Sequence, residues 1–104
     1  DGIIRFQKLI DYPSNKLSVV IDEGKKEIKQ GIIISITVFK GKVGIAVGIT
    51  NNLTQKYDAV ALVKIISEIL GGKGGGGRKD FAQAGGTNLK KIDEAFEVLS
   101  KKII

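Results

Sequence analysis

Residues 32–50 read IIISITVFKGKVGIAVGIT, and this stretch decides the fold. Two runs rich in β-branched residues, 32–39 and 43–50, flank a Lys-Gly-Lys turn at residues 40–42, which is the pattern of a β-hairpin. In the second run, valine and isoleucine alternate with glycine and alanine. A strand face lined by residues that small lets a helix or another backbone approach closely. We therefore predict an antiparallel hairpin with one bulky face and one small face.

The sequence before the hairpin predicts a strand and a helix. Residues 3–10, IIRFQKLI, have the alternation of a strand. Pro13 suits the first position of the following helix, with Tyr12 or Ser14 as its cap, and Gly31 is placed to end it. The first strand and the first strand of the hairpin should then lie parallel, joined by a right-handed crossover.

The sequence after the hairpin predicts two more helices and a short strand. Asp58 is placed to cap a helix over residues 59–70 that is apolar on most of its circumference. The outer stripe of this helix is short: Lys64, Ser67 and Glu68. Residues 81–85 can form a short strand, and residues 86–88 open a last helix. The order β-α-β-β-α-(β)-α predicts an α/β (α+β) fold, with a mixed sheet of about four strands covered by three helices.

Composition limits the function classes. The chain has 104 residues, begins at Asp1 and holds no Met, so we expect residues 1–104 to be a single globular domain from a longer chain. The absence of Cys and His excludes a disulfide framework, a zinc finger, a thiol nucleophile and a histidine base. A net charge of +6 favours a polyanionic partner, with an ordinary basic surface as the alternative. The absence of cysteine suits a cytoplasmic protein, which we therefore expect. No apolar run approaches the ~20 residues of a membrane span, so we expect no membrane partner.

A glycine-rich segment, residues 71–80, reads GGKGGGGRKD and calls for a functional explanation. Six of the 14 glycines fall within seven positions, where nothing blocks approach to the backbone amides. Successive N–H groups in such a loop form an anion nest, and Lys73, Arg78 and Lys79 add positive charge. Gly85-Gly86 leads into the last helix, whose N-terminus is a second place for an anion. Phosphate is the predicted ligand, and a flexible linker is the alternative.

The remaining candidates predict no catalytic or metal site. The literal GxGxxG match at residues 72–77 follows a helix, whereas a dinucleotide fingerprint follows a strand. The acidic pairs on the predicted helices splay across the surface because adjacent helical residues do not face each other. Asp80 is expected to fix the glycine loop or to pair with the arginine beside it. Tyr57 and Phe81 flank loops, where core packing and base stacking are both open.

Residues 71–86, GGKGGGGRKDFAQAGG, carry a family resemblance. A glycine run, an arginine, a short variable stretch, Ala-Gln-Ala and Gly-Gly resemble the DHH-associated domain at the C-terminus of alanyl-tRNA synthetases, a domain shared with the DHH phosphoesterases. Lys79 stands where that family commonly has Pro, and Phe81 where it commonly has Met. DHH nucleases usually carry a His after the glycines. This chain has none, which favours the synthetase branch.

The resemblance implies an accessory domain that contacts the tRNA elbow and helps the aminoacylation and editing centres act on one tRNA. The catalysis, with ATP, Mg²⁺ and Zn²⁺, would belong to other domains of the parent, and this domain would hold no cofactor, catalytic residue or metal. The implied partners are tRNA(Ala), the other domains of the parent and a second copy, bound through a helical segment that these residues lack. The alternatives are the substrate-binding lobe of a DHH phosphoesterase or oligoribonuclease, and a module for stability or oligomerisation. The predicted nucleic-acid contacts are Lys73, Gly74, Gly75, Gly76, Gly77, Arg78, Lys79, Gln83, Gly85 and Gly86.

Overall fold

The structure, a computed structural model, describes residues 3–28, 30–72 and 75–103. The strands are β1 (Ile3–Ile10), β2 (Gly31–Phe39), β3 (Lys42–Ile49), β4 (Gly75–Gly77) and β5 (Phe81–Gly86). The helices are α1 (Leu17–Glu27), α2 (Ala59–Ile69) and α3 (Ile92–Ile103). Three short 3-10 turns accompany them: η1 (Ser14–Lys16), η2 (Asn51–Leu53) and η3 (Leu89–Lys91).

The described strands form one sheet in the order β1-β2-β3-β5-β4. β1 runs parallel to β2, as the crossover predicts, and the other neighbours are antiparallel. The predicted fold class is confirmed. The sheet has five strands among the described residues rather than about four, because part of the glycine run pairs with β5 as an additional edge strand.

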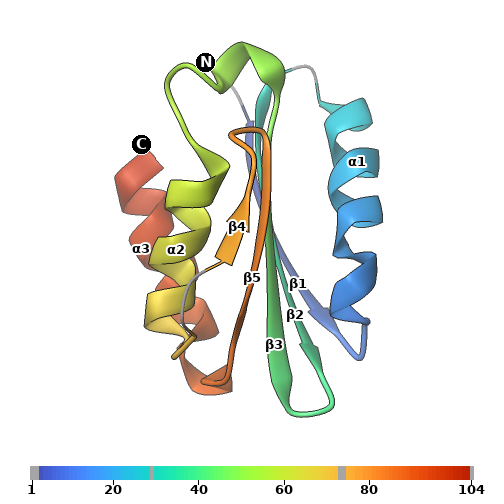
Figure 1. Ribbon diagram of the computed structural model, residues 1–104, viewed down its shortest axis with the longest axis vertical. Helices are drawn as coiled ribbons and strands as arrows, with labels where there is room; N and C mark the ends of the chain where they lie inside the picture. The colour runs from blue at the N-terminus through green and yellow to red at the C-terminus, as the bar shows by residue number, and fades with distance from the viewer. Residues whose placement is uncertain (1–2, 29, 73–74, 104) are drawn as a thin grey trace.

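Helices cover both faces of the sheet (Figure 1). α1 packs on one face, and α2 with α3 packs on the other. The larger core lies on the α2 and α3 side, where isoleucines and valines of β2 and β3 meet apolar side chains of both helices. The smaller core lies under α1 and is built from Leu17, Ile21, Ile28, Ile33 and Ala46. The sheet therefore has one bulky face and one small face, as the sequence predicts.

The central hairpin shows how local sequence sets the sheet. Phe39 pairs with Lys42, which leaves a two-residue loop with φ of 53° at Lys40 and 77° at Gly41. Two positive φ values are typical of a type I′ turn, whose twist matches that of the strands it joins. On the small face, a side chain at Gly48 would collide with Ile21 of α1. The glycine therefore lets the helix lie against the strand.

The boundaries of the first helix differ from the prediction. Pro13 precedes the 3-10 turn η1, and α1 itself starts after Lys16, which makes no side-chain cap. The helix ends at Glu27, and Gly31 is the first residue of β2 rather than the end of the helix. Gly31 pairs with Ile3 of β1, so it already belongs to the sheet, and its N–H donates to Thr50 Oγ1 at 3.0 Å.

The second helix starts as predicted and ends one residue earlier, at Ile69, with Leu70 as its C-cap. Asp58 Oδ1 accepts a hydrogen bond from the Val60 N–H at 2.9 Å, and Gly71 follows the helix with φ of 79°. Ser67 was predicted on the outer stripe, and that prediction is wrong. Its side chain is fully buried, and its hydroxyl donates to the carbonyl of Gly85 at 2.9 Å. A polar residue thus ties α2 to β5.

Candidate nucleic-acid interface

The glycine-rich motif forms a β-ribbon at one edge of the sheet, made of β4 and β5 (Figure 1). Phe81 packs with the core under α1, and Ala82 with the core under α2. Because strand residues alternate, Gln83 and Gly85 face the α1 side. Gly76 pairs with Gln83 and shares that face. α1 packs mainly on β2 and β3, so among the described elements this edge of the small face is less covered by the helix than the centre of the sheet is.

The extended backbone changes the predicted mode of anion binding. An anion nest needs successive N–H groups that converge on one point. Residues 75–77 are a strand, and successive N–H groups of a strand point in opposite directions. The nest is therefore not formed over these residues. What the ribbon presents is an outer strand of glycine, with bare backbone on its face.

The glycines of the ribbon differ in what the fold requires of them. A Cβ atom at Gly86 would lie 2.7 Å from Leu70 Cβ and 2.9 Å from the Leu70 carbonyl oxygen, so glycine is needed there for packing. A Cβ atom at Gly85 would meet only the Val43 carbonyl oxygen at 3.6 Å, and one at Gly76 would meet nothing within 4 Å. Packing does not require glycine at Gly76 or Gly85. Glycine inside a strand weakens it, and it is often found at a bulge or bend or where a ligand or another backbone comes close.

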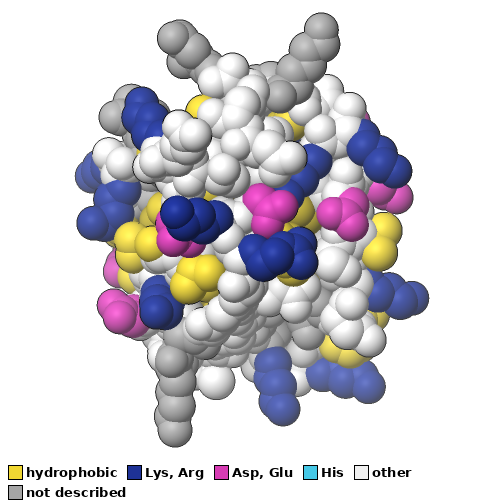
Figure 2. Space-filling model, turned by 45° about the horizontal axis from the view of Figure 1, so that its top comes forward, with side chains coloured by type: hydrophobic (Ala, Val, Ile, Leu, Met, Phe, Trp, Pro, Cys, Tyr) yellow, Lys and Arg dark blue, Asp and Glu magenta, His cyan; other side chains and the backbone are white. Residues whose placement is uncertain are grey.

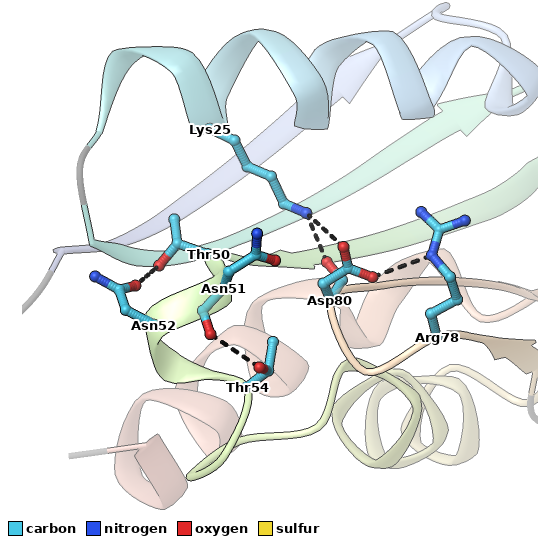
Figure 3. A network of polar contacts seen from close by, with 7 residues as sticks. All are labelled: Lys25, Thr50, Asn51, Asn52, Thr54, Arg78 and Asp80. Atoms are coloured by element: carbon cyan, nitrogen blue, oxygen red, sulfur yellow. Dashed lines mark hydrogen bonds and ion pairs between the residues drawn. The ribbon is translucent and has the colours of Figure 1, made fainter.

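A cluster of charged groups stands at the turn between β4 and β5 (Figure 3). Arg78 Nε donates to Asp80 Oδ1 at 3.1 Å. Lys25, which comes from α1, donates through Nζ to the Asp80 carbonyl at 2.8 Å, and its Nζ lies 3.8 Å from Asp80 Oδ2. The predicted pairing of Asp80 with Arg78 is confirmed. The hydrogen bond from Arg78 lowers the pKa of Asp80 below its ordinary value, with the Lys25 charge acting in the same direction and burial opposing.

This cluster leaves positive charge exposed. Arg78 has 75% of its side chain accessible, and only its Nε is bonded to Asp80. The two terminal nitrogens of a guanidinium held in this way remain donors for a phosphate or a carboxylate. Lys79 is also exposed, and its carbonyl accepts from the Ala59 N–H at 2.9 Å, which fixes the backbone of the turn to α2.

A hollow of about 540 Å³ opens beside the cluster. It is lined by Lys25, Ile28, Thr50, Asn51, Asn52 and Asp80. Thr50 Oγ1 donates to Asn52 Oδ1 at 2.6 Å, and the Asn51 carbonyl accepts from Thr54 Oγ1 at 2.9 Å (Figure 3). Sequence reasoning missed Lys25 and these asparagines, because nothing in the sequence links α1 or η2 to a residue as far along the chain as Asp80.

The predicted site residues lie along the ribbon rather than in one cradle. Lys73 and Gly74 lie outside the described residues. Arg78 is hydrogen-bonded to Phe81 at the start of β5, and Gly85 lies four residue steps further along the strand, which at about 3.3 Å per residue is roughly 13 Å. Gln83 lies between them, where a second hollow of about 260 Å³ opens beside Asn15 of η1. Gly86 is buried and belongs to the packing.

The N-terminus of the last helix does not offer its amides to an anion. The N–H groups of Thr87 and Asn88 both donate to the Leu70 carbonyl at 2.8 Å. Asn88 Oδ1 accepts from the Lys90 N–H at 3.2 Å and caps η3. The groups predicted to face a phosphate there are therefore used inside the fold.

On the face that Figure 2 shows, the charge is distributed rather than gathered into one patch. Figure 2 shows lysine and arginine side chains spread around the face that carries the upper end of the sheet, with carboxylates among them. Among the described residues, no three His, Cys, Asp or Glu side chains lie close enough to hold a metal ion. No described helix is long and apolar enough to cross a membrane.

The fold and the site define a small mixed α/β domain with a basic, glycine-rich ribbon at one edge of its sheet. Comparison of the sequence with models of known protein families identifies the family within this class. The family model described as the DHHA1 domain matches residues 5–104, so the chain belongs to the DHHA1 domain family. The predicted resemblance is thereby confirmed.

Three curated relatives carry the name alanine-tRNA ligase. The chain is 45% identical over 84 residues to the protein of Hyphomonas neptunium and 49% identical over 86 residues to that of Bradyrhizobium diazoefficiens. It is 42% identical over 98 residues to that of Parvibaculum lavamentivorans. These matches cover 81%, 82% and 93% of this chain. The chain spans about a tenth of the length of each relative, with 10%, 10% and 11% covered.

Two solved structures share the fold. The C-Ala domain of alanyl-tRNA synthetase from Aquifex aeolicus superposes with a TM-score of 0.89 at 24% identity, over 97% of this chain and 90% of that one. The DHH domain of a protein described as a member of a ribosomal protein family superposes with a TM-score of 0.55 at 19% identity, over 88% of this chain and 21% of that one. At these identities the likenesses concern the fold alone.

Proposed function

We propose that this chain is the C-terminal accessory domain of an alanine-tRNA ligase and that it binds tRNA(Ala) through the β4–β5 ribbon. The observation that carries the proposal is the exposed Arg78 guanidinium, which Asp80 holds at the start of a ribbon whose Gly76 and Gly85 leave the backbone bare. Ligation of alanine, with ATP and metal ions, would be the work of other domains of the parent. The names of the curated relatives support that parent.

The chemistry of the ribbon suits RNA. Protein contacts to folded RNA rely on backbone phosphates, 2′-hydroxyls and exposed bases rather than on a readable groove. Arg78 and Lys79 supply charge for phosphates, and Gln83 supplies an amide on the same face as the bare glycines. Contact at the tRNA elbow, where two loops expose bases and backbone together, is the form of binding that we propose. The net charge of +6 would assist the approach of the RNA.

The experiment that tests the proposal is the salt dependence of tRNA(Ala) binding by the 104-residue chain and by Arg78→Ala/Lys79→Ala. Each phosphate contact contributes about 0.7–0.9 to the slope of log K against log salt. The double variant should therefore lose about 1.4–1.8 in slope if each side chain neutralises one phosphate.

A matched control separates local contact from bulk charge. Lys64→Ala/Lys102→Ala removes the same charge from exposed positions on α2 and α3. The control should keep the slope of the unchanged protein. Equal slopes for all three proteins would refute the assignment of the ribbon, and no measurable tRNA binding by the unchanged chain would refute the proposed function.

The absence of His argues against the alternative function, the substrate-binding lobe of a DHH phosphoesterase or oligoribonuclease. Under that hypothesis, this domain would bind short oligonucleotides and position them next to a metal centre in another domain. The same titration with a short oligoribonucleotide tests it: we expect weaker binding than to tRNA. Tighter binding to the oligonucleotide than to tRNA would favour the phosphoesterase hypothesis instead.

A further inference from the structure

A third hollow, of about 330 Å³, lies at the end of the sheet opposite the Arg78 cluster. It is lined by the tip of the β2–β3 hairpin, with Phe39, Lys40 and Lys42, and by the glycine end of β5, with Gly85. Lys42 alternates with Ala46 along β3, and Ala46 belongs to the core under α1, so Lys42 stands on the α1 side. Gly85 stands on that side too. The hollow therefore continues the face that carries Gln83.

The lysines of this hollow have no acidic partner. Lys40 and Lys42 are both exposed, and neither takes part in an ion pair among the described residues. The Lys40 Nζ lies 5.3 Å from the centroid of the Phe39 ring, which holds the ammonium beside the hollow. No Asp or Glu stands among the described residues that line it. The hollow is electrically positive and open to an anion.

The backbone at Lys40 points to a role for its side chain. Lys40 has φ of 53°, a left-handed conformation that costs a lysine energy and that Asn, Asp or Gly adopts more readily. The turn would be more stable with one of those residues. Gly85 gives a parallel observation, because the fold has room for a side chain there and the chain has none. At both positions the residue present is less favourable for folding stability than another residue would be, and both positions line the same hollow.

We infer that this hollow is a second contact for RNA, in which Lys40 and Lys42 bind backbone phosphates over the bare backbone of Gly85. The inference rests on the proposed function and extends its site: Gly85 belongs to both contacts, and Lys40 and Lys42 belong to the second contact alone. Lys42 lies one residue pair beyond Gly86 and thus six residue steps along the sheet from Phe81, so the two basic ends would contact the same RNA at points roughly 20 Å apart. Neither lysine belongs to the glycine motif in the sequence. The pairing of β3 with β5 brings them beside Gly85 in the folded chain.

The test uses two variants that leave the fold intact or stabilise it. Lys40→Asn suits the left-handed turn, and Gly85→Ala fits the space that the structure leaves. We expect both variants to keep or raise the midpoint of thermal unfolding and to bind tRNA(Ala) more weakly. The double variant Lys40→Asn/Lys42→Gln is the hairpin variant. It should lower the slope of log K against log salt by about 1.4, for two phosphate contacts at ~0.7 each. Lys64→Ala/Lys102→Ala is the charge-matched control.

The outcomes separate this inference from the proposed function. If the unchanged chain binds tRNA and the hairpin variant has the same slope, the second contact is refuted and the ribbon contact stands. If the hairpin variant and the control lose slope equally, bulk charge explains the effect and the second contact is refuted. If the unchanged chain does not bind tRNA, the proposed function fails and the second contact fails with it. Loss of slope in the hairpin variant alone supports the inference.

Discussion

The neighbouring glycines Gly85 and Gly86 should respond to alanine in opposite ways, although they look equivalent in the sequence. At Gly86 the added methyl would lie 2.7 Å from Leu70 Cβ and 2.9 Å from a backbone oxygen, and neither atom can move without shifting the end of α2. Overpacking of this kind costs about 1–3 kcal/mol. Reduced freedom of the unfolded chain returns about 0.4–1 kcal/mol. The net destabilisation should be about 1.3 kcal/mol, taking the middle of each range.

Gly85→Ala should not have the cost of overpacking. Its methyl would stand 3.6 Å from the Val43 carbonyl oxygen, an ordinary van der Waals distance, and the residue does not have a left-handed φ. The variant should therefore gain up to about 1 kcal/mol from the unfolded state. For a domain of this size, 1 kcal/mol moves the midpoint of thermal unfolding by about 4–8 °C. The two variants should differ by roughly 10 °C.

Thermal unfolding followed by circular dichroism measures both variants against the unchanged chain. We expect a lower midpoint for Gly86→Ala and an equal or higher one for Gly85→Ala. Equal destabilisation of the two variants would show that Gly85 is also required by the fold. Folding alone would then explain why position 85 is glycine, and a bound ligand would not be needed as the reason.

Three further predictions concern other parts of the domain. Asp58→Ala removes the cap of α2 and should cost about 1 kcal/mol, or about 4–8 °C in midpoint, in the same thermal assay; an unchanged midpoint would mean that the cap is satisfied otherwise. Gly48→Ala forces a methyl against Ile21 and should lower the urea midpoint by an amount equivalent to about 1–3 kcal/mol, whereas no change would mean that α1 shifts freely on the sheet. The lowered pKa of Asp80 means that its ionised form stabilises the fold above the ordinary carboxyl pKa of 3.8, and that this contribution disappears as the pH falls through the lowered value. The stability difference between the unchanged chain and Asp80→Asn in urea titrations should therefore be constant from neutral pH down to about pH 4 and shrink only in stronger acid; a difference that grows in acid would contradict the sign.

Local patterns predicted the fold well where side chains carry the signal. The alternation in residues 32–50 predicted the hairpin and its small face, and Asp58 predicted the start of α2. β4 was missed because three glycines have no side chains to alternate, and their pairing depends on β5. Ser67 was misplaced because a serine in a helix is commonly exposed. Only the packed structure shows its acceptor, the carbonyl of Gly85.

The candidate site was predicted less completely than the fold. The motif identified Arg78 and its partner Asp80, which are neighbours in sequence. Lys25 reaches the same carboxylate from 55 residues away, and no local signal marks such a contact. The hairpin lysines were taken only as a turn, because their nearness to Gly85 depends on the pairing of β3 with β5. Residues that a sheet brings together are the part of a site that a single sequence hides.

The measurement that tests the proposed RNA contact most directly is binding of the 104-residue chain to tRNA(Ala), to an unrelated tRNA and to a DNA duplex across a range of salt concentrations. We expect tighter binding to both tRNAs than to the duplex, because the ribbon and its basic ends contact folded RNA. This preference should persist as salt weakens the electrostatic part. Equally weak binding to all three, lost together as salt rises, would contradict the proposed contact and leave the net charge of +6 as the only source of affinity.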